Sequence, residues 1–263
     1  MDFFISQLIS GLSMTSILLM ISLGLAIIYG TTGVINMAHG EFVMIGAYTS
    51  WFLQTTFGMG LLVSIIPIFL ITALMGFLIE RIVIRHLYNR LLDTILATWG
   101  IGVLLQQLIR LTVGSELKYL KIPSFMAESM TLFGQEVSIY RVFIFVFAIL
   151  TFFIAWFIIY KTSFGIRLRA VTQNKDIASC FGINSGVVYS STFAFGTGVA
   201  AVAGAFIAPL KSISPDMGTN YIIDAFMVVV LGGVGSLTGT AASSLIIGET
   251  SSFLASFSND TLA

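Results

Sequence analysis

The residues best suited to chemistry lie in a polar, glycine-rich segment at 30–42, which reads GTTGVINMAHGEF and follows a long apolar run. Irregular backbone exposed to lipid lacks hydrogen-bond partners, so such a segment within a membrane must face protein or water. Broken helices in transporters offer polar groups to a solute, and an ionisable residue at membrane depth indicates a functional site. The translocation path that we expect here is lined by Thr31, Thr32, Asn36, His39 and Glu41.

A simpler interpretation explains the same residues. The segment would then be a tight turn between two helices at the cytoplasmic surface, where Glu41 favours the positive end of a helix dipole. For Glu41 and His39 the sequence leaves both interpretations open.

A second interruption lies at 231–240, where LGGVGSLTGT places four glycines in ten residues. Each glycine costs a helix about 1 kcal/mol, so this density indicates unwound backbone or very close helix packing. The first three, Gly232, Gly233 and Gly235, are further path candidates. Two such segments in the two halves of a transporter are the expected trace of internal repeats around a central site.

Two adjacent amides, Gln106 and Gln107, lie at the end of the charge-free run at 94–109. Side-chain amides can replace water around a small neutral solute, and they form hydrogen bonds between membrane helices equally well. No Lys or Arg lies within the predicted spans near the first interruption. This slightly disfavours a dedicated partner for the carboxylate of an amino acid.

The loop at 161–184, KTSFGIRLRAVTQNKDIASCFGIN, repeats apolar residues at spacings of three, four and seven beside basic ones. This pattern predicts a pair of amphipathic helices bracketed by Gly165 and Gly182. An interfacial helix that directs its basic side chains to lipid headgroups would show the same pattern as a docking element for a soluble partner. The pattern alone does not separate the two.

Composition places these segments in a membrane protein. Of 263 residues, 57% are apolar and 9% are charged, with a mean hydropathy of +1.01. A net charge of zero leaves no basic field for nucleic acid, and one cysteine and two distant histidines give no disulfide or metal motif. The chain has no phosphate-binding GxxxxGK[ST] loop and no HExxH. We expect neither an enzyme nor a bound cofactor.

Continuous apolar runs, rather than alternating ones, predict an all-α membrane protein, a polytopic bundle of seven or eight transmembrane helices with broken or re-entrant segments. The predicted spans are 6–29, 41–57, 61–84, 93–113, 138–160, 185–209 and a broken pair between 220 and 257. Basic residues cluster in the loops at 80–93 and 161–176, which predicts that both face the cytoplasm. The connection at 112–135 and the amino terminus are then expected outside.

Four motifs resemble the permease subunits of bacterial ABC importers for branched-chain amino acids and urea, and the resemblance covers nearly the whole chain. They are GVINMAHGEFVMIGAY, LDTILATWGIGVLLQQ, GIRLRAVTQNKDIASCFGIN and VVVLGGVGSLTGT. Within that group, RAVTQNK and DTILATWGIG look most like the urea permease, the first of two paralogous membrane subunits.

The resemblance implies a multi-pass inner-membrane protein whose residues 1–263 form one transmembrane permease domain of about eight helices. The implied partners are a second paralogous permease, two cytoplasmic ATPase subunits that bind ATP and Mg²⁺, and a periplasmic substrate-binding protein. In such importers a short cytoplasmic helix of the permease sits in a groove of the ATPase. The matching positions for this coupling are Gly165, Arg167, Arg169, Ala170, Asn174, Asp176, Ala178 and Gly182.

The expected function is a translocation path for urea, moved by the ATPase partners. A branched-chain amino acid or a short-chain amide is the alternative solute, and a stand-alone channel or ion-coupled carrier is the alternative class. The resemblance also implies one more apolar span after residue 263, so the last helix is expected to be missing from this sequence.

Overall fold

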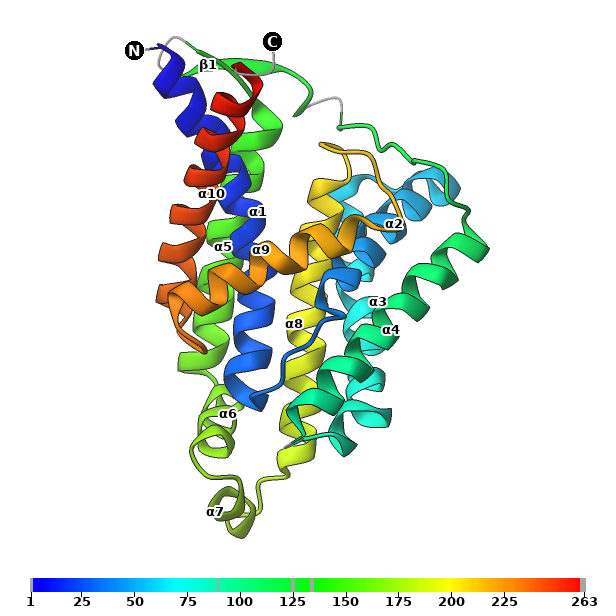
Figure 1. Cartoon of the computed structure of the whole chain (residues 1–263), viewed down its shortest axis with the longest axis vertical. Coiled ribbons are helices and arrows are strands. Elements are labelled where there is room, and N and C mark those ends of the chain that lie inside the picture. The colour runs from blue at the N-terminus through cyan, green and yellow to red at the C-terminus, as the bar shows by residue number, and fades with distance from the viewer. Residues whose placement is uncertain (1, 89, 124–125, 133–134, 261–263) are drawn as a thin grey trace.

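The computed structural model describes residues 2–88, 90–123, 126–132 and 135–260, which are almost entirely helical (Figure 1). The described helices are α1 (Asp2–Thr32), α2 (His39–Phe57), α3 (Leu61–Ile82), η1 (Ile84–His86), α4 (Leu91–Thr112), α5 (Ile139–Lys161), α6 (Ser163–Gln173), α7 (Lys175–Cys180), α8 (Ser185–Ile207), α9 (Met217–Gly232) and α10 (Leu237–Asp260). A short antiparallel hairpin joins β1 (Ser129–Leu132) to β2 (Gln135–Ser138), with Ser129 opposite Ser138.

Eight of these α-helices coincide with the predicted apolar segments, and α6 and α7 form the predicted amphipathic pair. Within the described residues, five helices are long and apolar enough to cross a membrane by themselves. They are Gln7–Thr32, Leu61–His86, Leu91–Thr112, Ile139–Lys161 and Ser185–Ile207. The predicted count of seven or eight crossings is therefore not confirmed.

The two ends of the bundle differ in the way that the basic loops predict. In Figure 1, α6, α7 and the α3–α4 connection lie at the lower end. The β1–β2 hairpin, the first turns of α1 and the last turns of α10 lie at the upper end. The two basic loops thus share one end, opposite the polar connection. This arrangement agrees with the predicted topology.

Helices α1 and α8 form the centre of the bundle. Of their apolar windows, 78% and 83% are buried, against 22% or less for α3, α4 and α5. Small residues permit this packing, because a Cβ on Gly24 of α1 would lie 2.3 Å from the carbonyl oxygen of Gly196 in α8. The outer helices, α4 above all, keep wide apolar faces free for lipid or for another subunit.

Candidate functional site

The first interruption is a re-entrant segment deep in the bundle. Helix α1 ends at Thr32, and Gly33 adopts a φ of +66°, which starts six residues of non-helical backbone. The chain then returns along α1, because His39 Nε2 lies 3.1 Å from the carbonyl oxygen of Ile21. Ile21 precedes the end of α1 by eleven residues, or about 16 Å of helix. Helix α2 therefore begins part-way up α1 (Figure 1) rather than at the end of the bundle.

The polar residues of this segment differ in how their hydrogen bonds are used. The hydroxyls of Thr31 and Thr32 donate to Ile27 and Ile28 of their own helix. Asn36 Oδ1 accepts from the Ala38 backbone N–H at 3.1 Å, which helps to begin α2. By contrast, Asn36 Nδ2 and His39 Nδ1 are buried, and no partner for either lies in the part of the chain that the structure describes. Within this segment, the unused donors and acceptors therefore follow the turn at Gly33.

Glu41 occupies the first turn of α2 and is only 3% exposed. Its Oε1 accepts a hydrogen bond from Gln106 Nε2 at 2.8 Å and a longer one from the Thr219 hydroxyl at 3.5 Å. Gln106 also donates to Thr219 Oγ1 at 3.1 Å. The second carboxylate oxygen, Oε2, is buried and has no partner among the described residues. Three helices, α2, α4 and α9, thus meet at one half-satisfied carboxylate, while the neighbouring Gln107 is exposed and outside this group.

Close backbone contact surrounds the carboxylate. A Cβ on Gly40 would lie 2.1 Å from the carbonyl oxygen of Gly218, and a Cβ on Gly218 would lie 2.8 Å from Glu41 Oε2. The first turns of α2 and α9 therefore cross at two glycines, and the carboxylate rests against bare backbone. The positive ends of both helix dipoles face this crossing and favour an anion there.

Helix α4 is tied to the re-entrant segment mainly by polar links. Thr98 Oγ1 accepts from the Met37 backbone N–H at 3.1 Å, Gln106 reaches Glu41, and Arg110 forms an ion pair with Asp216 just before α9. These links lie eight and four residues apart, and so on one face of the helix. Only 17% of the apolar window of α4 is buried.

The sequence indicated the Gln106 and Glu41 residues but missed Thr98, Arg110, Asp216 and Thr219. Each of these contributes through a contact across at least 61 residues of sequence, and no local pattern marks such a contact. The polar spacing from Thr98 to Gln106 and Arg110 on one helical face was the available signal.

The second interruption joins α9 to α10 and lies at a different level of α1 from Glu41. Gly233 and Gly235 have φ of +85° and +79°, and Gly232 packs on Gly239. A Cβ on Gly30 would lie 2.4 Å from the Cα of Gly235, so the two interruptions touch at the lower end of α1. Gly30 is nine residues beyond the level of Ile21, about 14 Å along α1. The structure therefore separates the glycine candidates from Glu41.

A hollow of about 210 Å³ connects this second interruption with α6. Its lining includes Thr31, Gly235 and Arg169. The guanidinium of Arg169 donates to the Ile159 carbonyl at the end of α5 and lies 5.6 Å from the centre of the Tyr160 ring. Arg169 thus fixes α6 to α5 within the chain.

Side-chain caps define the two short helices. Thr162 Oγ1 accepts from the Gly165 N–H at the start of α6, and Asn174 Oδ1 accepts from Asp176 and Ile177 at the start of α7. Gly165 is buried against the end of α5, since a Cβ there would lie 1.9 Å from the Ile159 carbonyl oxygen.

The predicted apolar stripe of these helices divides into two sets. Val171 and Ala178 are buried, and Ala170 is half-buried. Ile166, Ile177 and Phe181 are 60%, 57% and 82% exposed. Beside the exposed set lie the exposed candidates Arg167, Asp176 and Gly182, the last with a φ of +78°. The lower end of the molecule therefore carries three exposed apolar side chains on and next to α6 and α7, which we call the α6–α7 foot (Ile166, Ile177 and Phe181).

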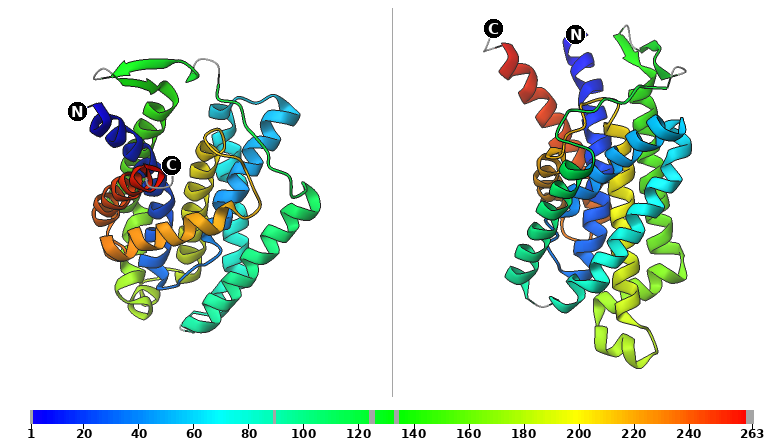
Figure 2. Two further views of the ribbon diagram at one scale, coloured as in Figure 1. Left: turned by 45° about the horizontal axis from the view of Figure 1, so that its top comes forward. Right: turned by 90° about the vertical axis from the view of Figure 1, so that its right-hand side faces the viewer.

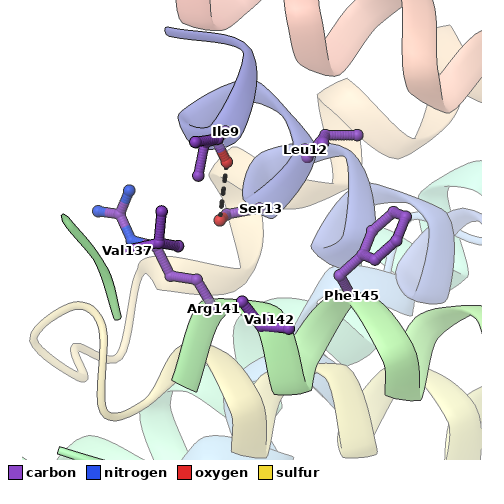
Figure 3. A pocket seen from close by; sticks show the side chains of 7 residues that line it. All are labelled: Ile9, Leu12, Ser13, Val137, Arg141, Val142 and Phe145. Carbon is purple, nitrogen blue, oxygen red and sulfur yellow. Dashed lines mark hydrogen bonds between the residues drawn. The ribbon is translucent and has the colours of Figure 1, made fainter. Parts of the chain in front are cut away.

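A separate hollow of about 230 Å³ lies between α1 and α5 near the upper end (Figure 3). Its lining is apolar except for Ser13, whose hydroxyl donates to its own helix, and Arg141. Arg141 donates to Ser10 at the rim. None of the residues around Glu41 lines this hollow. Among the described residues, no group of three His, Cys, Asp or Glu side chains is placed to hold a metal ion.

Comparisons with known proteins identify the family of the chain. The family model "Branched-chain amino acid transport system / permease component" matches residues 7–261. The chain is 31% identical to the high-affinity branched-chain amino acid transport system permease protein BraD of Pseudomonas aeruginosa, over 95% of this chain and 86% of that protein. It is 30% identical to LivH of Escherichia coli, a permease protein of the same description, over 94% and 84%. No solved structure matches the chain.

Proposed function

Because the chain belongs to the permease family of branched-chain amino acid transport systems, we propose that it forms part of the path for a branched-chain amino acid in an ATP-driven importer. As a member it is a transport permease subunit of the inner membrane and not an enzyme, as predicted. The prediction of urea has no support from these relatives, which are named for branched-chain amino acids. The alternative solute from the sequence thus becomes the main proposal.

The observation that carries the path proposal is the buried re-entrant segment before α2. Buried polar atoms in a protein interior are normally hydrogen-bonded, and an unpaired one calls for an explanation. Asn36, His39 and Glu41 each have such an atom. A path that exchanges hydrogen bonds with a solute requires such atoms. Thr31 and Thr32, which use their hydroxyls within α1, contribute less to this path.

The partners that we propose follow from the surfaces left uncovered. The apolar face of α4, with Leu104 and Leu111 70% and 78% exposed, suits a second permease subunit or lipid. The α6–α7 foot suits a groove on a cytoplasmic ATPase, which would hold ATP and Mg²⁺. A periplasmic substrate-binding protein would deliver the solute to the opposite end.

A physical route links the foot to the path. In this proposal a movement of α6 carries Arg169, which lines the same hollow as Gly235 and Gly30, and the two interruptions touch at those two glycines. ATP drives transport only if the ATPase subunits bind this foot more tightly in one conformation of the permease than in the other. Glycines with positive φ on either side of the contact give the backbone freedom to change.

Reconstitution of the complete importer tests this function. We expect ATP-dependent uptake of leucine and little uptake of urea, and vesicles with only the membrane subunits should not accumulate leucine. Uptake of urea in preference to leucine would contradict the proposed solute, and accumulation without ATPase partners would favour a carrier.

The foot is tested by Phe181→Asp, which should abolish ATP-driven uptake by placing a charge where an apolar groove is expected. The matched control is Ser179→Asp, which adds the same charge to an exposed polar position of α7. Equal uptake by both variants would argue against a docking role for Phe181.

A further inference from the structure

We propose that Glu41 is the site that receives the positively charged ammonium group of the transported amino acid, in the place now filled by the amide of Gln106. This inference rests on the proposed function and specifies one step of it. It assigns a substrate group to one side chain.

The first argument is the state of the carboxylate itself. Glu41 is 3% exposed, and its donors, Gln106 and Thr219, are both neutral. Among the described residues, no Lys, Arg or His forms an ion pair with it. A buried carboxylate is costly unless a cation and further donors compensate it. An ammonium group supplies a positive charge and three N–H donors, which matches the unpaired Oε2 and an Oε1 whose two donors are neutral.

The second argument is access. Gln106 is half-buried and Thr219 is exposed, so these two side chains are the outermost layer over the carboxylate. Gln106 belongs to α4, which is held by a few polar links and little apolar burial. A displacement of α4 therefore removes the amide from Glu41 and opens the carboxylate to an incoming donor. In this arrangement Gln106 occupies the site until the substrate arrives.

The third argument is the charge beside the site. Arg110 follows Gln106 by one turn of α4 and pairs with Asp216, two residues before the glycine that touches Glu41 Oε2. The structure therefore brings a cation next to the first interruption, contrary to the expectation that none lies there. An acidic group on α2 and a basic group on the polar face of α4 suit a zwitterion, whereas urea carries no charge for either.

Direct occupancy is tested by thiol protection, which does not depend on the binding protein. Thr219→Cys in a Cys180→Ser background places a reactive thiol beside Glu41 in the purified permease pair. Leucine should slow modification at least threefold, and 4-methylpentanoate, which lacks the ammonium group, should not. Glu41→Gln in the same background should abolish the protection by leucine.

Transport by the complete importer gives the second measurement. Glu41→Gln should lower the maximal rate of leucine uptake at least tenfold with assembly retained, and Glu41→Asp, which keeps the charge, should recover part of it. The matched control is Glu249→Gln, because Glu249 also has a buried oxygen without a partner among the described residues but packs against Gly11 of α1, away from the residues around Glu41. We expect the control to transport within twofold of the wild type.

Each outcome bears on one claim. Protection by leucine that survives Glu41→Gln, or uptake by that variant within twofold of the wild type, overturns the role of Glu41. A Glu41→Gln chain that fails to assemble, beside a Glu41→Asp chain with wild-type uptake and no protection by leucine, assigns a structural role and also overturns it. A wild-type importer that transports urea and not leucine would instead overturn the proposed function.

Discussion

Two buried glutamates on neighbouring helices show how differently a carboxylate can be used in one membrane protein. Glu80 of α3 is fully buried, and each of its oxygens accepts a hydroxyl donor. Tyr88 donates to Oε1 at 2.6 Å, and Ser190 of α8 donates to Oε2. Burial raises the pKa of the Tyr88 phenol, which keeps it a donor. Glu41 is almost as buried but leaves Oε2 unpaired.

The surroundings of the two residues differ in the same way. Around Glu80, α3 and α8 pack closely, with Gly76 against Thr197 and the Thr197 hydroxyl directed at the Thr72 carbonyl. Around Glu41, three helices meet through polar links and helix ends. A satisfied buried network fixes one arrangement, whereas an unsatisfied one retains capacity for a ligand or a second arrangement. The comparison therefore separates a structural carboxylate from a functional one.

The largest effect on stability is expected from Glu80→Leu. The change removes the acceptor of the half-buried Tyr88 hydroxyl and leaves Ser190 only the Gly186 carbonyl, and an unsatisfied buried group costs about 1–3 kcal/mol. The thermal midpoint of the purified permease in detergent should fall, and the yield of assembled importer should fall with it. Glu80→Gln keeps one acceptor oxygen and should fall between this variant and the wild type. An unchanged thermal midpoint for Glu80→Leu would contradict the structural role of Glu80.

The next effect in size is expected from Gly40→Ala. The added Cβ would lie 2.1 Å from the Gly218 carbonyl oxygen, so α2 and α9 must separate. Overpacking of this kind costs about 1–3 kcal/mol. Because Glu41 lies at the same crossing, leucine uptake should fall together with the thermal midpoint. Gly60→Ala is the matched control, since nothing lies within 4 Å of a Cβ there and its φ is −63°. Equal behaviour of the two variants would mean that the crossing is not tight.

The sequence alone predicts the helices and the polar segment that contains Glu41, but it does not predict the burial of Glu80. The polar segment at 30–42 is conspicuous because glycine, amide and charge interrupt an apolar run, so Asn36, His39 and Glu41 could be identified. The helices also follow from apolar runs. Glu80 was placed at the start of a basic cytoplasmic loop, whereas α3 continues to Ile82 and buries it. Its burial depends on Ser190, a contact 110 residues away that no local pattern indicates.

The hairpin and the partners of Glu41 were missed for related reasons. The connection at 112–135 is polar and has no strong alternation, so β1 and β2 gave no signal. Thr219 contacts Glu41 across 178 residues, and only the path of α9 across the bundle brings it there (Figure 2). Local patterns thus predict which residues are available for a site. The packing of distant helices decides which of them meet.

A smaller effect is expected from Thr98→Val, which tests whether α4 is held by its polar links. The change removes the acceptor of the Met37 N–H, worth about 1 kcal/mol. Loosening of α4 should increase the rate at which Thr219→Cys reacts in the Cys180→Ser background, with a small fall in the thermal midpoint. Thr112→Val is the matched control, because that exposed hydroxyl bonds only within its own helix. If Thr98→Val does not change the thiol reactivity, apolar contacts hold α4 in place.

The smallest effect on stability is expected from Glu41→Gln. Its comparison with Glu80→Gln best distinguishes a functional carboxylate from a structural one. Gln keeps an oxygen that accepts from Gln106 and removes a formal charge that forms no ion pair among the described residues, so the desolvation cost falls as one acceptor is lost. The free energy of unfolding, derived from the thermal midpoint, should stay within about 0.5 kcal/mol of the wild-type value. This is the range of neutral substitutions. Glu80→Gln, with two hydroxyl donors to satisfy, should melt lower. Should Glu41→Gln melt as low as Glu80→Gln, both carboxylates would be structural, and a loss of uptake in the Glu41 variant would follow from instability alone.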